Sequence, residues 1–367
     1  MTSTISAPPD DIAPGLPAPA EPGRRRPGGG LAQYLLIRFL LIFPTILILV
    51  TVVFVLMRAT GDPITAALGG RLPPDQLAER IAAAGYDRPV LTQYFEYLGN
   101  IFTGDFGTTI SDNRPVTEVL TTYGAATLEL AVYALLVAFV VGIPLGRIAA
   151  SHRDRAADAG LRVSAVLMYA TPVFFAGMVL KLIFSVGLGW FPVSGRASTA
   201  SQIEMQRHGA GTGIYLIDAI STGDPKVVWD VLEHAVLPAI ALGLLTAGVF
   251  LRLVRTNVIG TLSTGYVEAA RSRGVSERRL LRKHAWRPAL VPIITVIGLQ
   301  IALLLAGAVL TETTFEWKGL GFQLVQYVLA RDFVAVQGMV ALLAVIVAIT
   351  NFVVDVIAAL VDPRIRY

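Results

Sequence analysis

The sequence holds one short charged segment whose residue order suits it to contact another protein. Glu268 falls in the first turn of a predicted short helix, where a carboxylate complements the helix dipole. Ala269 and Ala270 are small enough for close packing, and Gly274 suits the left-handed position that ends such a helix. Ser276 can then cap a second short helix. The pattern predicts a helical hairpin that either docks into a groove on a partner protein or lies on anionic lipid.

Five ionisable residues inside or beside long apolar segments form a second candidate set, because a charge in hydrocarbon is costly and usually functional. Glu129, Lys181 and Asp355 lie at or within such segments. Each is a candidate for a pore, although pairing with another group is the favoured interpretation. Glu312 and Glu316 lie just outside a segment. They are candidates for an outer gate or a contact with a partner, with a plain acidic rim as the equal alternative.

The motifs of several other chemistries do not occur in the sequence. It has no His-Glu-x-x-His zinc motif, no Gly-x-Ser-x-Gly elbow and no Gly-x-x-x-x-Gly-Lys-Ser/Thr phosphate loop. The absence of cysteine excludes a thiol nucleophile and cysteine-ligated metals. We therefore expect no catalytic residue, no metal site and no cofactor in this chain, and no nucleic-acid partner. The alternative from another functional class is an intramembrane enzyme. An intramembrane protease that uses two aspartates would need both at membrane depth, and only Asp355 lies in a span.

The elements that hold these residues must be largely apolar. Of 367 residues, 54% are hydrophobic and 15% are charged, against roughly a quarter charged in soluble domains. The mean hydropathy of +0.64 points to a polytopic membrane protein. A helix needs about 20 apolar residues to cross the hydrocarbon layer. The sequence predicts an all-α polytopic membrane protein with six transmembrane helices, near 36–57, 125–146, 161–186, 235–254, 289–311 and 334–361.

The distribution of basic residues predicts the orientation of these helices. Most of the 30 Lys and Arg residues lie in the N-terminal segment, the 147–162 loop, the 252–288 loop and the C-terminal tail. Basic residues accumulate on the cytoplasmic side of membrane proteins. We therefore expect both termini to be cytoplasmic.

Composition and spacing divide the chain into four predicted parts. A helix over 75–84 follows Pro73-Pro74 and ends at Gly85, and apolar residues at helical spacing predict another over 90–102. The Pro-, Ala- and Gly-rich beginning has the composition of a disordered segment. The predicted parts are a disordered cytoplasmic N-terminal tail (1–30), the first transmembrane helix (31–57), an outer-face helical cap (58–124) and a five-helix core (125–367) with a cytoplasmic loop at 255–288.

The charged loop also carries a family signature. Glu268-Ala269-Ala270-Arg271-Ser272-Arg273-Gly274 resembles the EAA-x-x-x-G motif of bacterial ABC-importer permeases. In the peptide/nickel branch this motif runs on into a His-Ala-x-x-Pro-Ala-Leu-x-Pro segment, which here is His284 to Pro292. Over 31–367 the chain is similar to permease subunits of peptide/nickel-family ABC importers, most of all to the dipeptide branch that forms the first permease of a heterodimer. Further family-like strings lie in order along the chain: Gly61-Asp62-Pro63, Thr127 to Leu130, Phe191 to Arg196, Gly307 to Thr313, Gly319-Leu320-Gly321 and Asp362 to Tyr367.

The resemblance implies a function, partners and site residues. It implies the type I importer fold and ATP-driven import of di- or oligopeptides by alternating access across the bacterial cytoplasmic membrane, with nickel or another small solute as the alternative cargo. Glu268, Ala269, Ala270 and Gly274 would couple the permease to the ATPase, so that the loop is a coupling loop. The implied partners are a second homologous permease, two cytoplasmic ATPase subunits or domains that bind ATP and Mg, an extracellular substrate-binding lipoprotein and membrane lipid.

Overall fold

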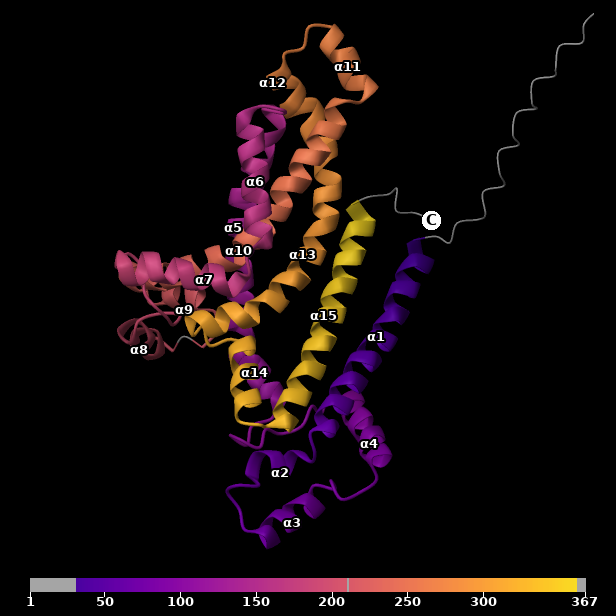
Figure 1. Cartoon of the computed structure of the whole chain (residues 1–367), viewed down its shortest axis with the longest axis vertical. Helices are drawn as coiled ribbons and strands as arrows, with labels where there is room; N and C mark the ends of the chain where they lie inside the picture. The colour runs from indigo at the N-terminus through magenta and orange to yellow at the C-terminus, as the bar shows by residue number, and fades with distance from the viewer. Residues whose placement is uncertain (1–30, 210, 362–367) are drawn as a thin grey trace, which may run out of the picture.

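The computed structural model describes residues 31–209 and 211–361. The predicted N-terminal tail, 1–30, and the terminal string 362–367 lie outside these residues. In the described ranges the regular secondary structure is helical (Figure 1), apart from one isolated β-bridge between Thr108 and Pro115. The predicted all-α class is therefore confirmed.

Five long helices dominate the part of the chain that the structure describes, and four of them are long and apolar enough to cross a membrane: α1, α5, α10 and α15. The bent pair of α6 and α7 makes a fifth crossing if the two are counted together. Helix α13 has 30 residues and covers the fifth predicted segment. The count of six crossings and the placement of the termini stay predictions. The bounds of the long helices are α1 (Leu31–Ala59), α5 (Val116–Ser151), α10 (Pro225–Leu262), α13 (Trp286–Phe315) and α15 (Phe333–Val361).

The third predicted span is broken near its middle. Helix α6 (Ala156–Ala170) and helix α7 (Val173–Leu180), which continues into the π-helical turn Lys181–Gly187, meet at 104°. Thr171 has an extended backbone (φ −77°, ψ 123°), because the residue before a proline is pushed out of the helical region. Pro172, which has no N–H to donate, then precedes α7.

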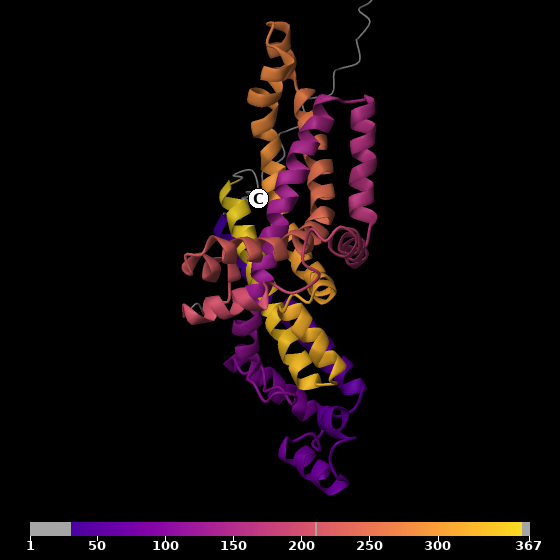
Figure 2. The same ribbon diagram turned by 90° about the vertical axis from the view of Figure 1, so that its left-hand side faces the viewer.

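Short helices lie at both ends of the molecule, and α8 and α9 project from its side between the two ends (Figures 1 and 2). The predicted cap helices both form, and Gly85 ends the first of them with φ +72°. α5 begins at Val116, within the predicted cap and directly after Pro115. The charged loop lies at the end of the molecule opposite α2, α3 and α4 (Figure 1). The short helices are α2 (Pro63–Leu68), α3 (Pro74–Ala83), α4 (Val90–Thr103), α8 (Thr199–Arg207), α9 (Tyr215–Ser221), α11 (Gly265–Ser272), α12 (Glu277–Arg279) and α14 (Leu320–Leu329).

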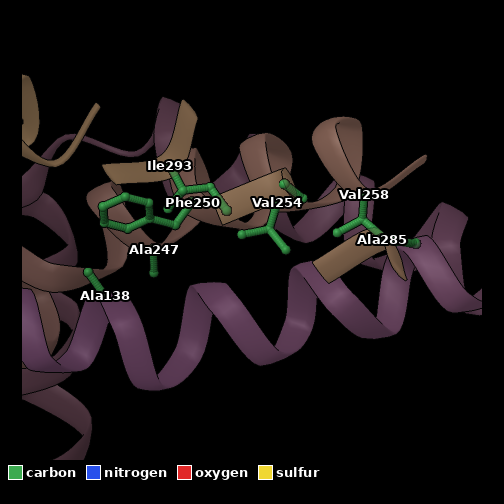
Figure 3. Packing of buried hydrophobic residues seen from close by; sticks show 9 residues of the cluster. Ala138, Ala247, Phe250, Val254, Val258, Ala285 and Ile293 are labelled. Carbon is green, nitrogen blue, oxygen red and sulfur yellow. The ribbon is translucent and has the colours of Figure 1, made fainter. Parts of the chain in front are cut away.

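The core lies where α5 and α10 pack against each other and against the start of α13. A Cβ on Gly142 of α5 would lie 2.6 Å from the carbonyl oxygen of Ala247 of α10, so only glycine permits this approach. Gly146 lies one turn further along α5, and a Cβ on it would lie 2.7 Å from the Leu251 carbonyl oxygen. Phe250 of α10 belongs to the same buried cluster as residues of α5 and α13 (Figure 3). Small residues thus bring the two helix backbones together, and larger side chains fill the space beside them.

Candidate functional site

The hairpin from Gly265 to Ala285, named the coupling hairpin after its predicted role, is fixed to the rest of the chain by buried residues. Val267 of α11 and Leu280, the first residue of the π-helical turn Leu280–Ala285, are both completely buried. The Tyr266 hydroxyl donates to the His284 carbonyl oxygen at 3.1 Å and so joins the two arms of the hairpin. The π-helical turn leads directly into α13. The hairpin is therefore held as a unit at the joint between α10 and α13.

The turn of the hairpin has the predicted glycine geometry. Gly274 has φ +83°, in the left-handed region that favours glycine. The Gly274 N–H donates to the Arg271 carbonyl at 2.9 Å, and the Val275 N–H donates to the Ala270 carbonyl at 3.3 Å. This pair of bonds is the Schellman arrangement that ends α11. The predicted cap of the second helix was wrong in detail, because Ser276 takes the N-cap position but its hydroxyl makes no capping bond.

The residues of the predicted contact surface face outward. Glu268 and Ala269 are exposed and Ala270 is half-buried. Within the described residues the Glu268 carboxylate has no salt-bridge partner, and an open hollow of about 930 Å³ lies beside it, between the hairpin and the ends of α5 and α10. Arg282 lines the same hollow. The hairpin thus presents an exposed carboxylate, a small-residue surface and basic side chains at one end of the molecule.

An ion pair crosses the turn of the hairpin. The Arg271 Nε lies 2.6 Å from Glu277 Oε1, and both side chains are exposed. The hydrogen bond from Arg271 holds the pKa of the Glu277 carboxyl below its ordinary value. Sequence reasoning missed this pair, although two opposite charges that flank a left-handed glycine are a signal for it. The pair fixes how the two arms are set relative to each other.

The predicted gate residue Glu312 is completely buried at the junction of α5, α13 and α14. The Thr127 hydroxyl donates to Glu312 Oε1 at 2.6 Å, and the Phe322 N–H donates to Oε2 at 2.9 Å. The Leu320 N–H donates in turn to the Thr127 hydroxyl at 2.8 Å. The carboxylate therefore ties three helices together, and the interpretation as an exposed acidic rim was wrong for Glu312.

A second buried carboxylate, Glu129, fastens the loop before α10 to α5. It is 4% exposed, and its Oε2 lies 2.5 Å from the Arg196 Nη2. The Leu216 N–H donates to Glu129 Oε1 at 2.8 Å. The Arg196 guanidinium also donates to the Gly213 carbonyl at 2.8 Å and lies over the Tyr215 ring at 3.7 Å. These contacts favour the structural pairing of Glu129 over direct contact with a passing solute.

The other predicted ionisable residues have separate surroundings. The Lys181 Nζ donates to the Thr314 carbonyl at 3.1 Å, near the end of α13. Glu316 is exposed and ends α13 with φ +51°. Asp355 of α15 pairs with Arg38 of α1 at 3.3 Å, away from this region. The structure thus gathers Lys181, Glu312 and Glu316 at one end of α13, and their role in a pore or gate stays a prediction.

Two further buried groups escaped sequence reasoning because their partners are distant in the chain. The Trp317 indole is completely buried and donates to the Ala126 carbonyl at 2.9 Å. Asp158, also completely buried, accepts two bonds from Arg255, at 2.6 Å from Nε and 2.7 Å from Nη2. This bidentate pair joins α6 to α10 near the coupling hairpin. No local pattern marks either contact.

Comparison with known proteins covers nearly the whole chain. The di/tripeptide transport system permease protein DppB of Pseudomonas aeruginosa (strain UCBPP-PA14) is 39% identical over 329 residues, 89% of this chain and 96% of the relative. The dipeptide transport system permease protein DppB of Escherichia coli (strain K12) is 38% identical over 340 residues, 92% of this chain and 99% of the relative. Among solved structures, inward-facing conformations of the MetNI methionine ABC transporter align with a TM-score of 0.49 and 17% identity, over 67% of this chain and 97% of that chain.

Two family models divide the chain between them. A model of the N-terminal part of binding-protein-dependent transport system membrane components matches residues 31–121. The model of the inner membrane component itself matches residues 142–367, which include the whole coupling hairpin and Glu312. The chain belongs to the family of binding-protein-dependent transport system inner membrane components.

Proposed function

We propose that this chain is the permease subunit of an ATP-driven importer that moves di- and oligopeptides across the bacterial cytoplasmic membrane. The observation that carries the proposal is the coupling hairpin: an exposed Glu268-Ala269 surface on a unit that is fixed by buried Val267 and Leu280. A surface held in this way can receive a push from a partner and pass it to the helices behind it. The names of the relatives, which are dipeptide and di/tripeptide permeases, support a peptide cargo over nickel or another small solute.

The path of force from the hairpin runs along α13. The hairpin continues through the π-helical turn into this helix, whose 30 residues span about 45 Å at 1.5 Å per residue. Ala285, the last residue of the π-helical turn, and Ile293 of α13 are packed in the core with Phe250 of α10 (Figure 3). At its far end α13 carries Glu312 and its three-helix junction. A displacement of the hairpin would therefore reach α10 directly and the Glu312 junction through a single helix.

The proposed partners follow from what this chain lacks and what its relatives are named. Without a phosphate loop, the chain depends on two cytoplasmic ATPase subunits or domains that bind ATP and Mg. A second homologous permease completes the pore, and an extracellular lipoprotein delivers the peptide to the outer face. The permease is then a two-state element in a multi-pass type I fold, and ATPase and binding protein each bias one state.

Uptake in a deletion strain tests the proposal. We expect a strain complemented with the wild-type chain to take up labelled di- and tripeptides. Glu268→Arg is expected to insert normally but to lose uptake and co-purification of the ATPase subunits. Glu79→Arg is the matched control, because Glu79 is exposed on α3 at the opposite end of the molecule, and it should keep the ATPase bound. Unchanged uptake and co-purification for Glu268→Arg would refute the coupling role.

A further inference from the structure

An open hollow of about 510 Å³ lies between α6 and α10, apart from the coupling hairpin and the Glu312 junction. Three arginines line it: Arg162 of α6, and Arg252 and Arg255 of α10. Its remaining walls are mainly apolar, with Val166 and Leu251 among them. Basic side chains beside an apolar wall match a ligand that carries both an anionic group and a hydrocarbon chain.

The charges in the hollow do not balance. Arg255 donates two hydrogen bonds to the Asp158 carboxylate, and the charge of this carboxylate neutralises that of Arg255. Arg162 approaches the same carboxylate only at 3.8 Å. In the described ranges Arg252 has no acidic partner, and its guanidinium lies 5.8 Å from the centre of the Tyr169 ring. Two positive charges are therefore left over at the hollow.

The surface next to the hollow is apolar and unpacked. Val163, Val166 and Leu167 of α6 are each more than half exposed in the chain. In Figure 2, α6 lies on one side of α5 and α10, and the coupling hairpin with the start of α13 lies on the other. The proposed path of force thus runs on the far side of the helices that form the hollow. A hydrocarbon chain could lie along this outward face of α6 without disturbing that path.

We propose that the hollow binds one anionic glycerophospholipid of the inner leaflet. Its phosphate is held by Arg162 and Arg252, and an acyl chain lies along the Val163–Val166–Leu167 face. Basic pockets between membrane helices on the cytoplasmic side suit anionic headgroups. A protein surface would need acidic groups at this position to match the same two charges. The inner-leaflet assignment rests on the proposed function, because the coupling hairpin defines the cytoplasmic end.

Native mass spectrometry of the assembled transporter tests the site. The complex is purified from nanodiscs of phosphatidylglycerol mixed with phosphatidylcholine. We expect wild type to retain phosphatidylglycerol, and Arg162→Gln or Arg252→Gln to weaken retention about fivefold each, with the double variant losing it. Arg252→Lys keeps the charge and should keep the lipid, which excludes misfolding as the cause. Arg155→Gln is the matched control, because it removes one exposed charge just before α6 without lining the hollow.

Several results would overturn the lipid site. Equal retention by the double variant and wild type would do so, and so would an equal loss in Arg155→Gln. Crosslinks from position 166 to the second permease, with no retained lipid, would assign the face to a protein partner instead. Co-purification of the ATPase is recorded in the same preparations. If wild type and the double variant retain phosphatidylglycerol equally and both still bind the ATPase, this site alone is rejected, whereas a complex in which wild type never binds an ATPase rejects the proposed function.

Discussion

Arg271 and Glu277 face each other across the Gly274 turn, with 2.6 Å between Nε and Oε1. They lie on the two arms of the coupling hairpin and bridge the turn that separates them. The pair is exposed, so it adds little to global stability. Its consequence is local: it restricts the angle at which α11, with Glu268 and Ala269, is presented to a partner.

Reversal of this ion pair should impair coupling, and the double reversal should restore it. Arg271→Glu and Glu277→Arg each place two like charges across the turn, so uptake of labelled dipeptide should fall while insertion is unchanged. The double variant restores an opposite pair and should recover most of the uptake. If the double variant is as impaired as the sum of the single ones, the pair has no role in setting the hairpin.

The same pair predicts a weak acid dependence of hairpin order. The pKa of Glu277 is lowered in the folded chain by its hydrogen bond from Arg271. The contribution of the pair is therefore complete above the unfolded pKa and is lost as the pH falls through the folded pKa. The protection factors of the α11 amides, which correct for the pH dependence of intrinsic hydrogen exchange, should be unchanged around neutral pH and fall only in acid. Glu277→Gln should remove this acid step, and a step that persists would contradict the assignment.

Gly319 should be intolerant of a side chain. A Cβ at this position would clash with the Glu312 carboxylate, inside a fully buried hydrogen-bonded junction. Gly319→Ala should therefore lower the free energy of unfolding by roughly 1–3 kcal/mol, since it displaces a buried acceptor from its donors. Gly70→Ala is the control, because no heavy atom lies within 4 Å of a Cβ there. Equal thermal unfolding of the two variants would contradict the account of the junction.

Removal of one member of the Arg196–Glu129 pair should release the loop that precedes α10. Arg196→Leu leaves a buried carboxylate without its cation, which costs roughly 3–5 kcal/mol. Limited proteolysis should then cut residues 197–224 faster than in the wild type. The double variant Arg196→Leu/Glu129→Leu removes both charges and should be less sensitive than the single variant. A single variant as resistant as the wild type would show that the pair does not hold the loop.

Close packing of α5 on α10 depends on Gly142. Gly142→Ala places a Cβ 2.6 Å from the Ala247 carbonyl oxygen, so the two helices must move apart. We expect the free energy of unfolding to fall by roughly 1–3 kcal/mol and the protein to unfold at a lower temperature. Gly160→Ala on α6 meets nothing within 4 Å and should be neutral or slightly stabilising. The comparison is made by thermal unfolding in detergent, and similar midpoints would contradict the close approach.

Local signals in the sequence predicted the elements whose causes are local. Pro73-Pro74 and Gly85 set the bounds of α3, and the left-handed Gly274 ended α11 where the spacing indicated. Pro172 lies at the break in the third predicted span, but nothing in the sequence fixes the 104° angle there. That angle depends on how α6 and α7 pack against α10.

Contacts between distant residues could not be predicted in the same way. Glu312 and Thr127 are separated by 185 positions, and Arg255 and Asp158 by 97. The cost of a charge in an apolar segment indicated that Glu129 needed a partner, but it did not identify Arg196. Hydropathy places each residue within or outside a span, whereas the helix faces that meet are set by packing between small residues such as Gly142.

Site-directed crosslinking of the coupling hairpin tests the central claim most directly. The chain has no cysteine, so Ala269→Cys introduces a single thiol on the exposed hairpin surface, and Ala83→Cys on α3 provides an exposed control at the opposite end. In membranes that contain the complete transporter, a short bifunctional reagent should join position 269, but not position 83, to an ATPase subunit. Crosslinking of position 269 to lipid alone, or solute transport by this chain reconstituted without any ATPase, would contradict the account.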